Sequence, residues 1–338
     1  MLLLDFGRSR FLACGFEIDT VVDSMEYTNP KTGKSFTRLL LVSTAMLALV
    51  PSSQSNPAES KSAPAISAQF DSKDWTEPFP PHRMVGNIYY VGSRGLAAYL
   101  ITTPGGHILI NSNLVSSVPM IRESIEKLGF HLSDVKILLI SHAHFDHDGG
   151  SATVRKLTNA RYMVMEPDVA VVESGGKSDF QYGDSPDLQY PPAKVDRVLH
   201  DGDQVTLGDT VLTAHLTAGH TKGCTTWTMK VREGNRAYDV VFVGSPNVNP
   251  GYKLVNNPRY PKIVTDYERG FQVLKSLPCD VFLGAHGSYF GMEAKFARMN
   301  SEDRNPYIDP EGYKSYVAER EQAFRSELEK QMAAAKTQ

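Results

Sequence analysis

Apolar residues recur in two alternating patterns from Trp75 onward. Short apolar segments bounded by Gly, Asn or Asp are typical of β-strands. They predict strands at residues 87–91, 97–102, 107–111, 135–140, 162–165, 205–207, 211–216, 225–231, 240–243 and 281–284. Apolar residues three and four positions apart are typical of helices. They predict helices at residues 117–128, 149–157, 263–277 and 311–332. Strands mixed with helices over about 250 residues, without an internal repeat, predict a layered α/β sandwich.

One long segment, residues 175–192, follows neither pattern. It is rich in Gly, Ser, Asp, Tyr and Pro. An irregular segment of this length inside a compact domain is usually a functional loop. Its aromatic residues Phe180 and Tyr182 can cover an apolar face of a substrate, or they can simply pack against the protein.

The N-terminal region has a different composition. Lys31, Lys34 and Arg38 precede the apolar run 39–50, which is followed by the Ser/Pro/Ala-rich segment 51–68. This order predicts a secretory signal peptide, because so short an apolar run cannot span a bilayer as a permanent helix. The alternative is a short amphipathic helix or an anchor, although no Cys follows the run to carry a lipid.

The position of this signal sets the expected domain boundaries. A signal peptide starts a chain, so Met25 is the expected initiator and residues 1–24 are an upstream extension. Residues 25–68 then form the signal peptide and linker, and residues 69–338 form one globular domain with a C-terminal helix. We therefore expect a periplasmic protein without a permanent membrane anchor.

Composition and charge exclude some classes of protein. The chain has 338 residues, of which 41% are hydrophobic and 22% charged, and this is ordinary globular composition. Its net charge is -3 and no stripe of Lys and Arg is interleaved with aromatics, so nucleic acid is not an expected partner. Cys224 and Cys279 would remain after processing, and the sequence leaves open whether they are close enough for a disulfide.

A cluster of metal-ligand residues follows the apolar run 135–140. It contains His142, His144, Asp146 and His147. Imidazole and carboxylate are zinc ligands, and alternate side chains of an extended segment point to the same side. His142 and His144 can therefore bind one ion while the other two begin a second site. A merely His-rich polar loop would match these spacings by chance in roughly one chain in a thousand or fewer.

Two further histidines occur in the same local context. His220 and His286 each follow a predicted strand and lie beside Gly, which lets the backbone turn close to a ligand. The other histidines lack this context, and we expect them to lie on the surface or to pack inside the protein. They are His82, His107, His131, His200 and His215.

These motifs resemble those of the metallo-β-lactamase superfamily, and within it the lactamases of subclass B3. The resemblance covers residues 75–299 and includes His-x-His-x-Asp-His at 142–147, Ala-Gly-His-Thr at 218–221, Asn-Pro-Gly-Tyr at 249–252, Asn-Pro-Arg-Tyr-Pro at 257–261 and Leu-Pro-Cys-Asp at 277–280. It implies an αββα sandwich with two Zn²⁺ per chain. One ion would be bound by His142, His144 and His220, and the other by Asp146, His147 and His286.

Three positions differ from residues that are common elsewhere in the superfamily, and two of them narrow the reaction that we expect. Many of its hydrolases carry a bridging Asp where this chain has Ser245, so no carboxylate is expected between the metals. The di-iron branch typically has Glu in place of His144, and this argues against redox chemistry. Asn111 stands where the family often has Asp, and it can accept a hydrogen bond without adding charge.

The resemblance implies that a zinc-bound hydroxide opens the ring of a small-molecule β-lactam, a penicillin, cephalosporin or carbapenem. Asp146 would accept a hydrogen bond from the hydroxide, and Tyr252 would donate one to the substrate oxygen. Ser245, Asn247 and Phe180 are the candidate substrate-binding residues. Ser245 and Asn247 also fit an alternative role as turn residues beside prolines.

Three functions remain to be compared. The first is β-lactam hydrolysis, and the second is dizinc hydrolysis of another cyclic ester or amide, such as a lactone. A non-catalytic zinc-binding protein is disfavoured, because structural zinc is usually closed by four ligands, often including Cys. Cys224 is expected to be a small buried strand residue rather than a nucleophile, since it has no basic partner beyond the histidines. The sequence does not predict an oligomeric state.

Overall fold

The computed structural model describes the backbone of residues 7–13, 16–28 and 35–43 and, with side chains, residues 73–299, 301 and 304–337. The chain divides into two units, Met1–Ala63 and Pro64–Gln338. The first contains an antiparallel sheet in the order β1-β2-β3, formed by β1 (Gly7–Ala13), β2 (Phe16–Thr28) and β3 (Ser35–Ser43). Strand β2 crosses the expected boundary at Met25. The expected linker, residues 51–68, lies outside the described residues, so the signal-peptide interpretation stays a prediction.

The second unit contains two sheets, of which the larger has seven strands in the order β10-β9-β8-β7-β6-β5-β4. These are β4 (His82–Val85), β5 (Ile88–Tyr90), β6 (Tyr99–Thr103), β7 (Gly106–Ile110), β8 (Val135–Leu139), β9 (Arg161–Met165) and β10 (Arg197–Leu199). Strands β7 to β10 pair in parallel. Their carboxyl ends therefore meet at one edge of the sheet.

The smaller sheet has five strands in the order β11-β12-β13-β14-β15. These are β11 (Gln204–Leu207), β12 (Thr210–Leu216), β13 (Thr225–Glu233), β14 (Arg236–Val243) and β15 (Val281–Gly284). The first four pair in antiparallel fashion, and β15 pairs in parallel with β14.

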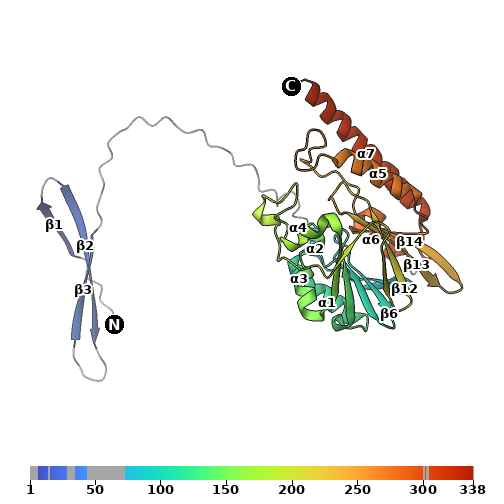
Figure 1. Ribbon diagram of the computed structural model, residues 1–338. Helices are drawn as coiled ribbons and strands as arrows, with labels where there is room; N and C mark the ends of the chain where they lie inside the picture. Colours follow the sequence, from blue (N-terminus) through green and yellow to red (C-terminus); the bar gives the residue numbers. More distant parts are fainter. Residues whose placement is uncertain are drawn as a thin grey trace. The chain divides into compact units, whose positions relative to one another are not determined.

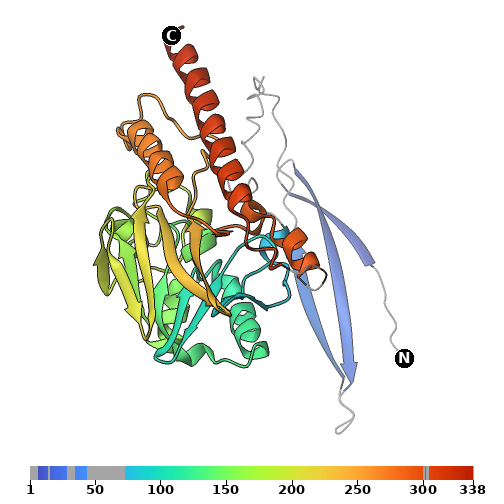
Figure 2. The same ribbon diagram turned by 90° about the vertical axis from the view of Figure 1, so that its right-hand side faces the viewer.

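The described part of this unit also contains α-helices. They are α1 (Val118–Lys127), α2 (Phe145–Asp148), α3 (Ser151–Thr158), α4 (Val169–Glu173), α5 (Ile263–Ser276), α6 (Met292–Arg298) and α7 (Pro310–Lys336). Short 3₁₀ helices are formed by Lys73–Trp75, Val115–Ser117, Leu132–Asp134, Glu166–Asp168, Pro186–Leu188 and Gly287–Phe290. Figures 1 and 2 show α1 and α3 on one side of the stacked sheets and α5 and α7 on the other. None of the helices in the described residues is both long and apolar enough to cross a membrane.

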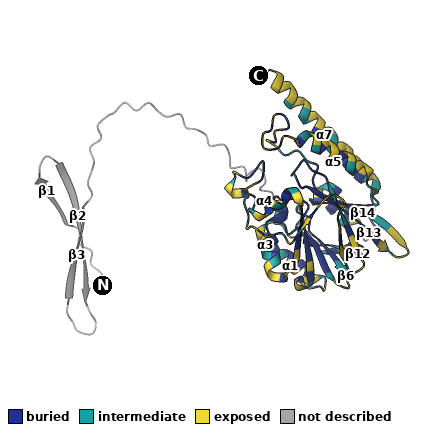
Figure 3. Ribbon diagram, in the orientation of Figure 1, coloured by how far each residue is buried: buried dark blue, intermediate teal, exposed yellow. Residues whose placement is uncertain are grey.

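The apolar residues form two cores, one on each face of the larger sheet. In β8, Ile137 and Leu139 belong to the core between the sheets, and Leu138 belongs to the core beneath α1 and α3. A strand covered on both faces needs apolar residues on both, which explains the continuous apolar run that precedes the metal-ligand cluster. Figure 3 shows the resulting buried layers and the exposed end of α7.

The predicted αββα sandwich is confirmed, and each predicted strand and helix is present with shifts of a few residues at its ends. The apolar pattern missed β1, β2 and β3, and in the described part of the second unit the elements that it missed are short. Strand β10 has three residues, of which Val198 is 42% exposed, so it shows no alternation. The C-terminal helix begins as expected from capping chemistry, because the Asp309 side chain accepts a hydrogen bond from the Gly312 N–H and Pro310 follows it.

Candidate metal centre and its pocket

Strand ends from both sheets deliver the six candidate ligands to one edge of the sandwich. His142 and His144 follow β8, and Asp146 and His147 form part of α2. His220 follows β12 and His286 follows β15 of the smaller sheet. Two contacts hold the sheets together at this edge: Thr225 N–H donates to the Ser141 carbonyl at 2.8 Å, and Trp227 Nε1–H donates to the Ile140 carbonyl at 3.0 Å.

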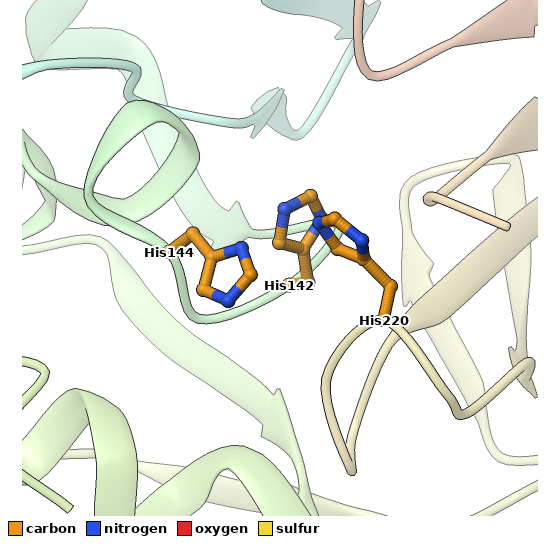
Figure 4. A group of neighbouring side chains, drawn as sticks. All are labelled: His142, His144 and His220. Carbon is orange, nitrogen blue, oxygen red and sulfur yellow. The ribbon is translucent and has the colours of Figure 1, made fainter. Parts of the chain in front are cut away.

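We call His142, His144 and His220 the first site. Their potential ligand atoms lie within 4.8 Å of one another, and their ring centroids are 4.6 to 4.9 Å apart. Figure 4 shows the three rings around one shared space, two from the segment after β8 and one from the loop after β12. His220 Nδ1 lies 2.8 Å from the Asn247 carbonyl oxygen. As an N–H donor, Nδ1 fixes the ring so that Nε2 is the ligand atom.

We call Asp146, His147 and His286 the second site. Their facing atoms form a small triangle: His147 Nε2 lies 3.1 Å from His286 Nε2 and 3.1 Å from Asp146 Oδ2, and His286 Nε2 lies 3.5 Å from Asp146 Oδ2. Zinc with bonds of 2.0–2.1 Å in tetrahedral geometry places its ligand atoms about 3.3 Å apart. The triangle therefore fits one zinc ion.

The protonation states also fit metal binding. Burial, reinforced by neighbouring imidazoles, lowers the pKa of His220 and His286 to about 3, and burial lowers the pKa of His144 to about 4. These rings are neutral at pH 7, which is the form that binds metal. Burial opposes ionisation of Asp146, but its electrostatic attraction and hydrogen bond to the His147 ring outweigh burial and hold the pKa of this carboxyl below its usual range. Within the described part of the chain, His142 Nε2 is buried without a hydrogen-bond partner.

A pocket opens above the two sites. It is lined by ligands of both, together with Trp75, Tyr182, Asn247 and Tyr289. Asn247 Nδ2–H donates to Tyr289 Oη at 2.8 Å, and Ser245 Oγ lies 3.1 Å from the same oxygen. Trp75 packs its ring 5.9 Å from that of His286. The pocket thus has an aromatic wall and a polar wall on either side of the metal ligands.

The predicted substrate-binding residues are placed differently from one another. Asn247 lines the pocket, whereas Ser245 is 2% exposed and reaches it only through Tyr289. Phe180 is buried against the rings of Tyr252 and Tyr260 and does not line the pocket. Phe180 therefore takes the packing role that the sequence left open.

Tyr252 also departs from the expectation that it donates to a substrate oxygen. Its hydroxyl donates to the His220 carbonyl at 2.8 Å, and the side chain is 2% exposed. A hydroxyl has one hydrogen to donate, and this one is already used. In this structure Tyr252 supports the backbone of a first-site ligand.

Other residues support the ligands, and the sequence had already indicated Asn111 as a hydrogen-bond acceptor. Asn111 Oδ1 accepts a hydrogen bond from Ser141 N–H at 2.8 Å, and Asn111 has a positive φ of 65°, which Asn tolerates. The Asp168 carboxylate contacts both loops of the first site. Neither Asp168 nor Tyr289 belongs to a motif with a known spacing. The one sequence signal for Tyr289 is its position three residues after His286, which places it close to a candidate ligand.

Cys224 and Cys279 are separate free thiols. Cys224 is fully buried, and its Sγ accepts a hydrogen bond from Ser245 N–H at 3.2 Å. Burial raises the pKa of this thiol to about 12. Cys224 is therefore a small buried residue as expected, although it lies just before β13 and not within it, and its neutral thiol is a poor nucleophile.

Comparisons with known proteins agree with this architecture. The sequence profile of the metallo-beta-lactamase superfamily matches residues 92–286. The structure is similar to the FEZ-1 metallo-beta-lactamase from Legionella gormanii, with 54% identity, a TM-score of 0.75 and coverage of 76% of this chain and 98% of that one. It is also similar to BJP-1, a subclass B3 enzyme of Bradyrhizobium japonicum, with 42% identity, a TM-score of 0.74 and coverage of 78% and 98%. A metal-dependent hydrolase of Anaeromyxobacter dehalogenans is 28% identical over 212 residues, which are 61% of this chain and 67% of that protein.

Proposed function

Because this chain belongs to the metallo-beta-lactamase superfamily of hydrolases, we propose that it is a dizinc β-lactamase that opens the ring of penicillins, cephalosporins or carbapenems. The observation that carries this proposal is the pair of three-residue clusters beneath a single pocket, His142, His144 and His220 in one and Asp146, His147 and His286 in the other. Asp146 is the only acidic residue among those lining it. A substrate that carries its own carboxylate therefore meets little negative charge that would repel it.

In this proposal, His142, His144 and His220 hold one zinc ion, and Asp146, His147 and His286 hold the other. When bound, zinc supplies a Lewis acid that acidifies water and polarises the substrate carbonyl. The protein residues orient these groups. Asp146 Oδ2 faces His147 and His286, and its carboxylate can also accept a hydrogen bond from the attacking water.

The polar wall of the pocket would bind the substrate. Asn247 uses one amide hydrogen to reach Tyr289 Oη, so its second amide hydrogen is available to a substrate oxygen. Ser245 supports the Asn247–Tyr289 pair through its own hydrogen bond with Tyr289 Oη. With Ser in place of a carboxylate at 245, no fixed negative charge repels a substrate carboxylate there, and like charges in such a pocket cost affinity.

Similarity to named enzymes supports the same substrate class. The proteins from Legionella gormanii and Bradyrhizobium japonicum are named as metallo-beta-lactamases, and this chain covers 98% of each. Hydrolysis of benzylpenicillin, a cephalosporin, a carbapenem and an acyl-homoserine lactone by zinc-loaded protein tests the proposal. We expect turnover of the β-lactams that a chelator abolishes. Turnover of the lactone alone would replace this function with the lactonase alternative.

Metal analysis tests the ligand sets without relying on activity. We expect wild-type protein to bind two zinc ions, His220→Ala to lose mainly the first and His286→Ala mainly the second. His215→Ala is the matched control, because His215 lies on β12 five positions before His220 and bonds to Thr228 Oγ1. Unchanged occupancy in either ligand variant would remove that residue from its site.

A further inference from the structure

Asp168 lies at the end of the 3₁₀ helix that follows β9, and its carboxylate is buried beneath the first site. Oδ2 accepts a hydrogen bond from Ala143 N–H at 3.0 Å and another from Thr221 Oγ1–H at 2.7 Å. Oδ1 accepts a third from Gly223 N–H at 2.7 Å. One carboxylate thus bonds to two loops that are far apart in sequence.

These two loops carry the ligands of the first site. Ala143 lies between His142 and His144 in the chain, and Thr221 directly follows His220. The contact is also close in space: a Cβ added at Gly223 would lie 2.6 Å from Asp168 Cγ, so a larger residue at 223 would force the loop away. The side chain of Asp168 therefore fixes the separation of the loops as well as their hydrogen bonding.

Burying the Asp168 carboxylate costs free energy, which indicates that the carboxylate has a specific role. Asp168 is 1% exposed, and no Lys, Arg or His forms an ion pair with it among the described residues. Burial of a carboxylate without a cation is unfavourable, and only its hydrogen bonds offset the cost. A neutral packing residue would avoid the cost but could not bond to three donors in both loops.

We propose that Asp168 is the positioning residue of the first site and that its carboxylate holds the two ligand loops at the spacing that one metal ion needs. It acts through the backbone and does not touch the ion. The second site does not need this spacing, because Asp146 and His147 come from one of the bridged segments and His286 comes from the loop after β15, so none of its ligands lies on the His220 loop. This inference rests on the proposed dizinc centre and adds that the two ions depend differently on one carboxylate.

A pair of substitutions separates the three bonds. In Asp168→Asn, the amide oxygen can keep Ala143 and Thr221, but the amide nitrogen then faces the Gly223 N–H, so one bond is lost. Asp168→Ala loses all three. Supporting groups around metal ligands typically contribute 10- to 100-fold in affinity, so we expect about a 10-fold loss of first-ion affinity for Asn and about a 100-fold loss for Ala.

Zinc affinity is measured by competition with a chromophoric chelator on the full chain. The His286→Ala background isolates the first site, and the His220→Ala background isolates the second. Asp196→Asn is the matched control, because Asp196 accepts a backbone hydrogen bond from Tyr162 on β9 but contacts neither ligand loop. Thr221→Val, which removes one donor, tests the same bridge if the Ala variant does not fold.

The expected result is a selective loss of first-ion affinity in the Asp168 variants and in Thr221→Val, with second-ion affinity and the control unchanged. Equal losses at both sites would show a general structural role and overturn the proposal. Unchanged first-ion affinity would also overturn it while leaving the dizinc function intact. If wild-type protein bound no zinc, the proposed function and this inference would both be wrong.

Discussion

Gln331, near the end of α7, supports the loop that carries Asn247 and Tyr252. Its Nε2–H donates to the Tyr252 carbonyl at 2.8 Å, and its Oε1 accepts a hydrogen bond from Leu254 N–H at 2.8 Å. The side chain thus pairs with the loop backbone as a neighbouring strand would. The rest of the last two turns of α7 is exposed, so Gln331 is their main attachment to the domain.

Gln331→Ala removes both bonds. Each is expected to contribute about 0.5–1.5 kcal/mol, so the loop should lose about 1–3 kcal/mol of stability against local opening. This corresponds to roughly 5- to 150-fold faster hydrogen exchange at the Leu254 amide, since about 1.4 kcal/mol is tenfold. We also expect a raised KM for β-lactams, because the same loop ends at the pocket wall formed by Asn247.

Amide exchange followed by mass spectrometry or NMR measures this effect directly. Gln322→Ala is the matched control, because Gln322 lies on the same helix and is exposed. Gln331→Glu adds a second comparison: it keeps an acceptor for Leu254 N–H but places a carboxylate oxygen near the Tyr252 carbonyl. The reasoning is refuted if Gln331→Ala folds normally and the Leu254 amide exchanges at the wild-type rate.

Three further predictions concern other parts of the chain. Ser245→Asp should raise zinc affinity and depress β-lactam turnover, because a carboxylate there would attract metal and repel the substrate carboxylate; full activity with unaltered metal affinity would place residue 245 outside the dizinc centre. Burial lowers the pKa of His82, so below about pH 6.5 the unfolded state binds more protons and stability falls as pH falls, by at most about 1.4 kcal/mol per pH unit. The free energy of unfolding, measured with urea between pH 5 and pH 7, should change less with pH in His82→Phe than in wild type. The exposed His200→Gln variant should keep the wild-type pH dependence. Equal pH dependence in His82→Phe and wild type would contradict the role given to His82. Exported protein should begin between about residue 50 and residue 69, and an intact mass that retains residues 1–24 would exclude the signal peptide.

The fold and the clustering of the six candidate ligands at one edge could be predicted because both are encoded locally. The continuous apolar run before His142 indicates a strand buried on both faces, and β8 has this position. His220 and His286 could be found because each follows a strand and lies beside Gly. Strand ends at one sheet edge are close in space even when they are far apart in sequence, so local patterns were sufficient.

The roles of the surrounding side chains depend on distances that no local pattern encodes. Tyr252 was expected to face the substrate, but its hydroxyl bonds to the His220 carbonyl. The sequence left open whether Phe180 covers a substrate or packs against the protein, and it packs against Tyr252 and Tyr260. Asp168 gave no signal, because its partners follow two other strands. Such roles are set by packing between segments. The sequence pattern alone does not specify which neighbours a side chain contacts.

The division of the ligands between the two sheets has a consequence for how the loaded protein is assembled. His142 to His147 precede His220 by more than seventy positions and His286 by about one hundred and forty. His142, Asp146 and His147 alone bring their ligand atoms within 4.8 Å of one another, so the earlier part of the chain carries an incomplete binding site of its own. Both sites are complete only after the later sheet has docked. In the proposed dizinc enzyme, metal bound at these sites would link the earlier and later halves of the domain, and zinc supply would then be thermodynamically linked to the completion of folding.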